Sequence, residues 1–277
     1  MQKVSLNPRV ETAPTSVHVN TLSDNLRVFW MPGCSSCVKV KEHLKRLGIA
    51  FESVNVLEQP EAREELAARG IRGAPIVSRG NRFVYAQSLE IVNEFLNITE
   101  ELPKRETEFL FKKWISLLNT GIGYLETCPP EELRANVLPG RDRPVGELAY
   151  HAFQIVDAFL HCMKSGEREW LDRASGAVKM DVALSKPLLL DFARKTTTEL
   201  ERYWNDGATE YKDVDASDRP FEGDLRTTHE FLDRSSWHSA QHLRQVATVL
   251  TRDGVALVPA WGDDMVKGLG VPNALWQ

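Results

Sequence analysis

The stretch Leu26-Arg-Val-Phe-Trp-Met-Pro-Gly-Cys-Ser-Ser-Cys37 decides the fold of the first third of this chain. Its apolar run over 26–30 predicts a strand, and the Met-Pro-Gly that follows predicts a turn. A helical pattern comes next, so Cys34 is expected at the N-terminus of a helix. There the unpaired backbone N–H groups and the helix dipole favour a thiolate over a thiol. Cys37 lies one turn later, where it can resolve a mixed disulfide.

A C-x-x-C pair is also half of many zinc sites. No second C-x-x-C and no H-x₃₋₅-H pair follows at zinc-finger spacing, so the sequence favours a redox dithiol over a structural metal site. The chain has 4 cysteines in 277 residues, too few for a disulfide framework. We therefore expect the dithiol to work in a reducing compartment, the cytoplasm.

The composition is that of a globular protein, with 42% hydrophobic and 26% charged residues, and the length allows two cores of ordinary size. The net charge is −5, so no basic footprint for nucleic acid is visible. No apolar stretch reaches transmembrane length, and the N-terminus lacks the apolar region of a signal peptide. We accordingly expect neither nucleic acid nor membrane as a partner.

Strands and helices alternate through the first hundred residues. Residues 1–24 are polar and weakly patterned and are interpreted as a flexible arm. The patterns that follow predict a strand at 26–30, a helix at 36–47, a strand at 51–56, a helix at 60–69, strands at 75–78 and 82–85, and a helix at 88–97. This βαβαββα order, with C-x-x-C after the first strand, is that of the α/β thioredoxin superfamily.

Within that superfamily the chain resembles a glutaredoxin. Besides Cys34-Ser-Ser-Cys37, the segment Arg72-Gly-Ala-Pro-Ile-Val77 matches the family's cis-proline loop, although by pattern alone the proline also suits a strand edge. The resemblance implies a thiol–disulfide oxidoreductase domain over 25–99 with Cys34 and Cys37 as catalytic residues. It also implies four thiol-binding residues at the proline loop and the last helix: Ala74, Pro75, Gln87 and Ser88.

The cosubstrate implied is glutathione or another low-molecular-weight thiol. Two segments depart from the glutathione-using pattern. Met31-Pro-Gly33 stands where a basic residue is usual, and Tyr85-Ala-Gln-Ser88 replaces a start rich in Gly and Asp. Ser88 can still cap the last helix and leave its N–H groups for a carboxylate.

After Leu102-Pro103 the hydrophobic period changes to that of amphipathic helices. Helices are predicted at 104–126, 144–164, 185–206 and 226–252. Four long amphipathic helices with irregular links are typical of an all-α four-helix bundle, which we expect over 104–277.

The chemistry of this half lies in its histidines. His238 and His242 are four residues apart on one helix, an arrangement that can chelate a metal ion. His151 lies on the inward stripe of the second helix, whereas His161 and His229 are interpreted as solvent-facing. The three inward histidines are either hydrogen-bonded core residues or metal ligands, and their number favours a metal site.

The segments Pro139-Gly-Arg-Asp-Arg-Pro-Val-Gly-Glu-Leu-Ala-Tyr-His151 and Trp237-His-Ser-Ala-Gln-His-Leu-Arg-Gln245 resemble the DinB-like four-helix family. The resemblance implies a divalent metal held by His151, His238 and His242, with zinc expected first and nickel or iron as alternatives. Some members are thiol-dependent isomerases or S-transferases. Five neighbouring side chains either contact ligands or are purely structural: Tyr150, Gln154, Gln241, Arg244 and Gln245.

Together these features predict a cytoplasmic glutaredoxin-like oxidoreductase fused to a metal-dependent, thiol-dependent transferase or isomerase. Its expected partners are a small-molecule thiol and a small electrophilic substrate. The sequence leaves the oligomeric state open and allows a homodimer. The alternative is a redox domain directed to its target by a non-catalytic bundle that binds a metal or a ligand.

Overall fold

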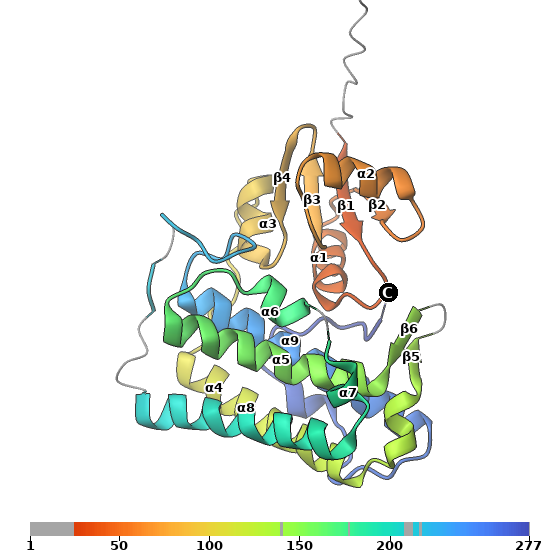
Figure 1. The fold of residues 1–277 in the computed structure, drawn as a ribbon. Coiled ribbons are helices and arrows are strands. Elements are labelled where there is room, and N and C mark those ends of the chain that lie inside the picture. Colours follow the sequence, from red (N-terminus) through yellow and green to blue (C-terminus); the bar gives the residue numbers. More distant parts are fainter. Residues whose placement is uncertain (1–24, 139–140, 177, 208–212, 216–217, 277) are drawn as a thin grey trace, which may run out of the picture.

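The computed structural model describes residues 25–276, apart from 139–140, 177, 208–212 and 216–217 (Figure 1). A mixed sheet with helices forms the first region, and a largely helical region follows it (Figure 1). The arm expected over 1–24 lies outside the described residues. No helix among the described residues is both long and apolar enough to cross a bilayer.

The first region has the predicted βαβαββα order. Its sheet has the strand order β2-β1-β3-β4, in which β1 runs parallel to β2 and antiparallel to β3. β3 and β4 form the hairpin expected around Gly80. The elements confirm the predicted bounds to within a residue: β1 (Leu26–Trp30), α1 (Ser35–Arg46), β2 (Glu52–Asn55), α2 (Pro60–Ala68), β3 (Ile76–Arg79), β4 (Arg82–Tyr85) and α3 (Leu89–Leu96).

Both faces of this sheet are covered. Successive side chains of a strand point to opposite faces, so Val28 and Phe29 of β1 enter different cores. Val28 packs with residues of α1 and α3, and Phe29 packs with residues of α2. The sheet therefore lies between helices. The turn after β1 lies at the end of the sheet.

The helical region is built around four long helices. α8 and α9 each pack against both α4 and α5. Large aromatic side chains such as Phe111, Trp114 and Phe159 fill the space between them. All four predicted helices are present: α4 (Thr107–Thr127), α5 (Val145–Ser165), α8 (Lys186–Gly207) and α9 (Thr228–Arg252).

The links contain short elements that the sequence analysis left irregular. Segments of three to five residues are too short to show a helical period. Two of them, β5 and β6, form a hairpin that precedes α5. The short elements are η1 (Pro130–Arg134), β5 (Asn136–Leu138), β6 (Arg141–Pro144), α6 (Leu171–Ser175), α7 (Met180–Ala183) and η2 (Asp263–Val266).

The two regions are in contact. α1 packs on α9, and the chain after α9 returns to the boundary between the regions (Figure 1). There the carboxylate of Glu42 on α1 accepts hydrogen bonds from the backbone N–H groups of Asn273 and Ala274, at 2.8 and 2.7 Å. The turn after β1 thus lies on the side of the first region that faces α9.

Candidate functional site

The dithiol stands where the chain turns from β1 into α1. Gly33 has a φ of +76°, a conformation that favours glycine, and Cys34 is the N-cap residue of α1. The Cys37 N–H donates to the Cys34 Sγ at 3.2 Å. The two cysteines form a disulfide with their Cα atoms 5.3 Å apart. Cys34 is half-buried and Cys37 is completely buried, so Cys34 is the sulfur that a substrate can reach.

The predicted proline loop faces this disulfide. The Ala74–Pro75 peptide bond is cis, as the resemblance implied. The carbonyl oxygen of Ala74 lies 4.0 Å from the Cys34 Sγ. Ser88 acts as the N-cap of α3, and its Oγ accepts from the Ile91 N–H at 3.3 Å.

The three inward histidines meet in the helical region. His151 comes from α5, and His238 and His242 come from successive turns of α9. Each offers a ring nitrogen, and these nitrogens all lie within 4.8 Å of one another. All three rings are buried, with 8% or less of each residue exposed.

Burial keeps these imidazoles neutral. Desolvation lowers the pKa of His151 to about 3, and the Arg143 and Arg234 guanidinium groups add to the shift. Desolvation likewise holds the pKa values of His238 and His242 well below the usual range. A neutral imidazole carries the lone pair that a metal ion requires.

Their hydrogen bonds leave ring nitrogens available. The Nδ1 of His242 is 2.7 Å from the Gln245 Oε1, which fixes that nitrogen as the donor and its Nε2 as the acceptor. The His242 Nε2 and the His238 Nδ1 are buried without a hydrogen-bond partner among the described residues. Buried polar atoms normally have partners, so this donor set fits a divalent metal ion better than a closed core.

The other two helical histidines differ from each other. His161 is partly exposed and lies 2.8 Å from the Glu167 carboxylate, in agreement with its predicted outward position. The prediction that His229 is solvated is wrong, because it is only 8% exposed. The segment before α4 covers it, and its Nε2 bonds to the Arg105 carbonyl oxygen at 2.7 Å.

Cys34 of the dithiol and the three histidines line a single cavity of about 340 Å³, which we call the shared cavity. The first region contributes its wall around the dithiol, with Met31, Gly33, Cys34, Ser35, Ser36, Gly73, Ala74 and Gln87. The helical region contributes Arg143, Glu147, His151, Trp170, Leu171, Ala174, Val178, Arg234, His238 and His242. Of the four predicted thiol-binding residues, Ala74 and Gln87 line it, whereas Pro75 and Ser88 do not.

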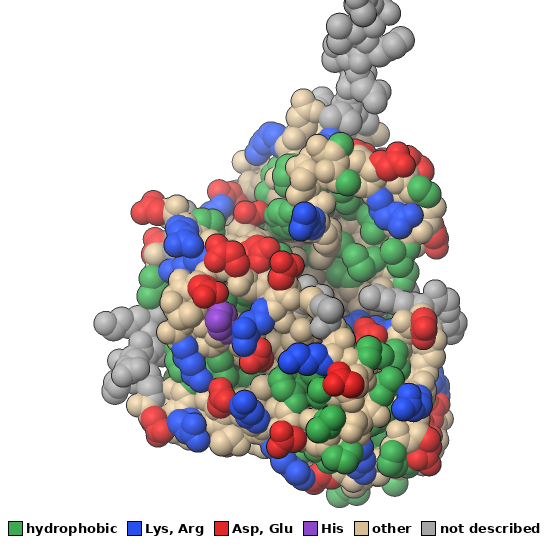
Figure 2. Space-filling model, viewed as in Figure 1, with side chains coloured by type: hydrophobic (Ala, Val, Ile, Leu, Met, Phe, Trp, Pro, Cys, Tyr) green, Lys and Arg blue, Asp and Glu red, His purple; other side chains and the backbone are tan. Residues whose placement is uncertain are grey.

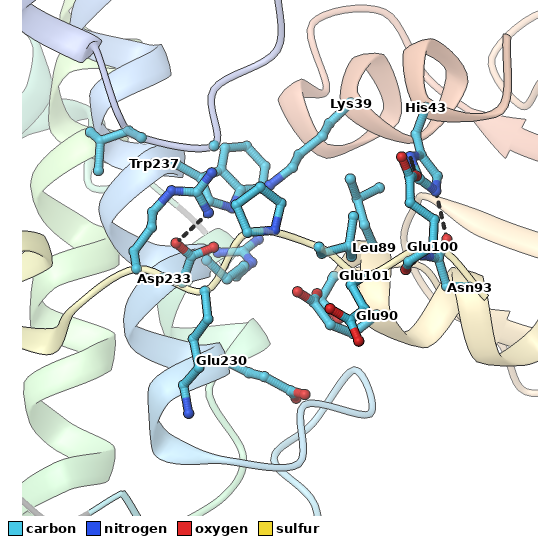
Figure 3. A pocket seen from close by; sticks show the side chains of 18 of the residues that line it. Lys39, His43, Leu89, Glu90, Asn93, Glu100, Glu101, Glu230, Asp233 and Trp237 are labelled. Carbon is cyan, nitrogen blue, oxygen red and sulfur yellow. Dashed lines mark hydrogen bonds and ion pairs between the residues drawn. The ribbon is translucent and has the colours of Figure 1, made fainter. Parts of the chain in front are cut away.

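A larger cavity, of about 1050 Å³, also lies between the two regions (Figure 3). Lys39 and Trp237 lie on one side of it and Glu90 and Glu101 on the other (Figure 3). Ser88 lines this cavity, but neither the dithiol nor the three clustered histidines do. We therefore place the candidate chemistry in the smaller, shared cavity.

Four charged or aromatic residues of the shared cavity were not predicted from the sequence as site residues: Arg143, Glu147, Trp170 and Arg234. Arg234 precedes His238 by four residues, so helical spacing alone places both on one face. Arg143 lies just before α5, and its Nε donates to the carboxylate of Glu147 in the first turn of that helix, at 3.1 Å. Trp170 lies in a link with no period to follow.

Among the described residues on the face shown in Figure 2, basic side chains do not gather into one patch. Basic and acidic side chains are interspersed over the helical region there (Figure 2). A nucleic-acid site would instead gather basic side chains into a patch or stripe.

The first region has known relatives. A family model described as Glutaredoxin matches residues 26–84. The N-acetyl-S-hydroxy-L-cysteine reductase of Bacillus subtilis (strain 168) is 33% identical over 75 residues, which cover 27% of this chain and 81% of that protein. The glutaredoxin-like protein NrdH of Lactococcus lactis subsp. lactis (strain IL1403) is 36% identical over 52 residues, or 19% of this chain and 72% of that protein. No solved structure matches this chain. Through its first region the chain belongs to the glutaredoxin family.

Proposed function

We propose that this protein is a thiol–disulfide oxidoreductase whose helical region holds a divalent metal and acts on the same small thiol. The observation that carries the proposal is the shared cavity, which both Cys34 and the three histidines line. A thiol released at Cys34 is thus already beside the histidines, without passing through solvent.

The redox step uses the two cysteines in turn. The Cys34 thiolate attacks the sulfur of an oxidised thiol R–S–X, forms a Cys34–S–S–R bond and releases X as a second thiolate or as hydroxide. Cys37 then loses its proton to solvent and attacks the Cys34 sulfur. This releases R–S⁻, which takes up a proton, and leaves the Cys34–Cys37 disulfide found in the structure. Two electrons pass to the substrate, and two molecules of a cellular thiol such as glutathione restore the dithiol.

The size of the cavity limits the substrate. A volume of about 340 Å³ is near the lower end of the roughly 300–1,000 Å³ typical of small-molecule sites. The Bacillus subtilis relative is named for the reduction of N-acetyl-S-hydroxy-L-cysteine, a small S-hydroxylated thiol. We extend this class, a small oxidised thiol, to the present chain.

His151, His238 and His242 would hold the metal, with zinc as the first expectation. A bound divalent ion lowers the pKa of a thiol ligand, so that a thiolate is present at neutral pH for addition to a small electrophile. Gln245 orients His242 for this role, since its Oε1 accepts from Nδ1 and directs Nε2 away from the amide.

The test separates the two activities in the full-length chain. Cys34→Ser should abolish disulfide reduction but leave the metal content and any thiol-dependent turnover of an electrophile. His238→Ala should abolish metal binding and that turnover but leave disulfide reduction. Metal-free protein without turnover of any electrophile in a screen with several cellular thiols would instead support a non-catalytic helical region.

A further inference from the structure

Arg234 is a buried charge at the centre of the site. It lies on α9 one turn before His238 and is 4% exposed. Arg234 lines both the shared cavity and the larger cavity. A guanidinium group stays charged, so its burial calls for compensation.

The contacts of Arg234 fix its plane but do not neutralise it. Its Nη2 donates to the Gln87 Oε1 at 3.1 Å, and the guanidinium carbon lies 4.2 Å from the centre of the Trp170 ring. The Nε and Nη1 atoms are buried without a hydrogen-bond partner in the described part of the chain. The neighbouring carboxylate of Asp233 pairs instead with Arg105, at 3.0 Å.

The shared cavity therefore carries more positive than negative charge. Arg143 and Arg234 face a single carboxylate on its wall, that of Glu147, and Glu147 pairs with Arg143 at 3.1 Å. Desolvation lowers the pKa of Arg234 to about 9, as expected for a cation that no anion offsets. A ligand entering this cavity meets unused N–H donors and an uncompensated positive charge.

We propose that Arg234 binds the carboxylate of the small thiol or disulfide that Cys34 reduces. This inference rests on the proposed oxidoreductase function and specifies its substrate class. The planar fork of a guanidinium matches a carboxylate, and the contacts with Gln87 and Trp170 hold it ready for such a bond. Arg234 belongs to the helical region. The helical region therefore selects substrates for the dithiol of the first region.

Three disulfides of similar size and different end groups test the assignment: dithiodipropionate, which carries carboxylates, bis(2-hydroxyethyl) disulfide, which is neutral, and cystamine, which carries amines. Reduced full-length protein is mixed with each, and the rate of oxidation of its dithiol is followed. Arg234→Met should slow dithiodipropionate about tenfold or more relative to the neutral disulfide, because a buried cation that the anion needs is lost. Taking each rate relative to wild type cancels the intrinsic reactivity of the disulfides.

Two variants serve as controls. Arg234→Lys keeps the charge and should retain part of the preference for dithiodipropionate. Arg226→Met removes an arginine that pairs with Glu94 outside the shared cavity, and it should leave the preference unchanged. Arg234→Met also removes the contact with Gln87, and a loss of stability from that change would slow all three disulfides alike, so the ratio between the disulfides is the quantity compared. Equal slowing of all three disulfides by Arg234→Met would overturn the proposal.

A binding measurement keeps the inference distinct from the proposed function. Calorimetry should show that dithiodipropionate binds oxidised wild-type protein and that Arg234→Met weakens this binding. If no disulfide is reduced, the oxidoreductase proposal fails, yet binding lost in Arg234→Met would still support the carboxylate site. Equal binding by both proteins would overturn it, as would competition by inorganic phosphate stronger than that by propionate.

Discussion

Cys34 and Cys37 lie one turn apart on α1 but differ in what surrounds them. Cys34 is the N-cap residue and faces the shared cavity, whereas Cys37 is completely buried behind it. The free N–H groups of the first helical turn stabilise a negative charge on the N-cap sulfur. From position and exposure we therefore expect Cys34 to attack and Cys37 to resolve the mixed disulfide.

This assignment predicts different alkylation of two variants. In reduced protein, Cys37→Ser leaves Cys34, which should react with iodoacetamide near neutral pH. Cys34→Ser leaves Cys37, which should react more slowly and need a higher pH. Burial raises the pKa values of Cys128 and Cys162 to about 11, so these thiols stay protonated below that pH and give little background. Faster alkylation of Cys37 than of Cys34 near neutrality would reverse the roles.

A second residue-scale prediction concerns the metal. Purified protein should carry about one divalent ion per chain, as expected for a three-histidine site. His238→Ala or His242→Ala should remove most of it, because each leaves only two ring nitrogens. His161→Ala is the matched control, since this histidine pairs with Glu167 at the surface. The metal content of each dialysed protein is measured. An equal loss of metal from His161→Ala would contradict a metal site at His151, His238 and His242.

At the scale of elements, α9 connects the parts of the site. It contacts α4, α5 and α1, and most of the side chains along it are buried. Arg234, His238, His242 and Gln245 follow one another at three- or four-residue spacing, so they share one face. The arginine proposed to bind a carboxylate, two of the three candidate metal ligands and the amide that orients His242 therefore come from a single helix.

The entry of α5, which positions His151, depends on a close backbone approach at Gly146. A Cβ at this position would lie 2.2 Å from the Ala183 carbonyl oxygen of α7. Gly146→Ala should lower the free energy of unfolding by about 1–3 kcal/mol, the usual cost of overpacking. Gly123→Ala is the control, because its Cβ would meet nothing within 4 Å, and Ala in a helix interior is favoured over Gly by about 0.5–1 kcal/mol. Urea unfolding followed by tryptophan fluorescence measures both, and similar effects would contradict the structure at α7.

The sequence predicted the long elements and not the links, for a physical reason. The strands, the α1 start at Cys34 and the four long helices carry enough residues to show a period. The β5–β6 hairpin is local but too short to show a period. The burial of His229 depends on contacts between distant segments, which a local pattern does not contain. The same holds for Trp170 and for the return of Asn273 to Glu42. Arg234 is different, since its spacing from His238 was visible and only its burial was not.

At the scale of the whole molecule, the site exists only where the two regions meet. Cys34 lies in one wall of the shared cavity and the three histidines lie in the other. Direct contacts hold the regions together: Arg234 with Gln87, Arg226 with Glu94, and Glu42 with the chain after α9. Further contacts join Tyr85 to Asp224 and Lys39 to Trp237. Several of these contacts are exposed or only partly buried, and an exposed ion pair contributes little. The covalent link between the regions should therefore matter for function.

The last prediction tests this link. Domains are expected over 25–99 and 104–277. Glu101 lies between them and is exposed, so a specific protease should cleave a recognition site inserted at this position. A short tether keeps the regions at an effective concentration in the millimolar range. After cleavage, thiol-dependent turnover of an electrophile should fall as the protein is diluted to low micromolar concentration, whereas uncleaved protein should keep its activity per chain. Reduction of bis(2-hydroxyethyl) disulfide needs only Cys34 and Cys37 and should survive cleavage at every dilution. Should cleaved and uncleaved protein match in both assays at all concentrations, the tether has no catalytic role and each region works alone.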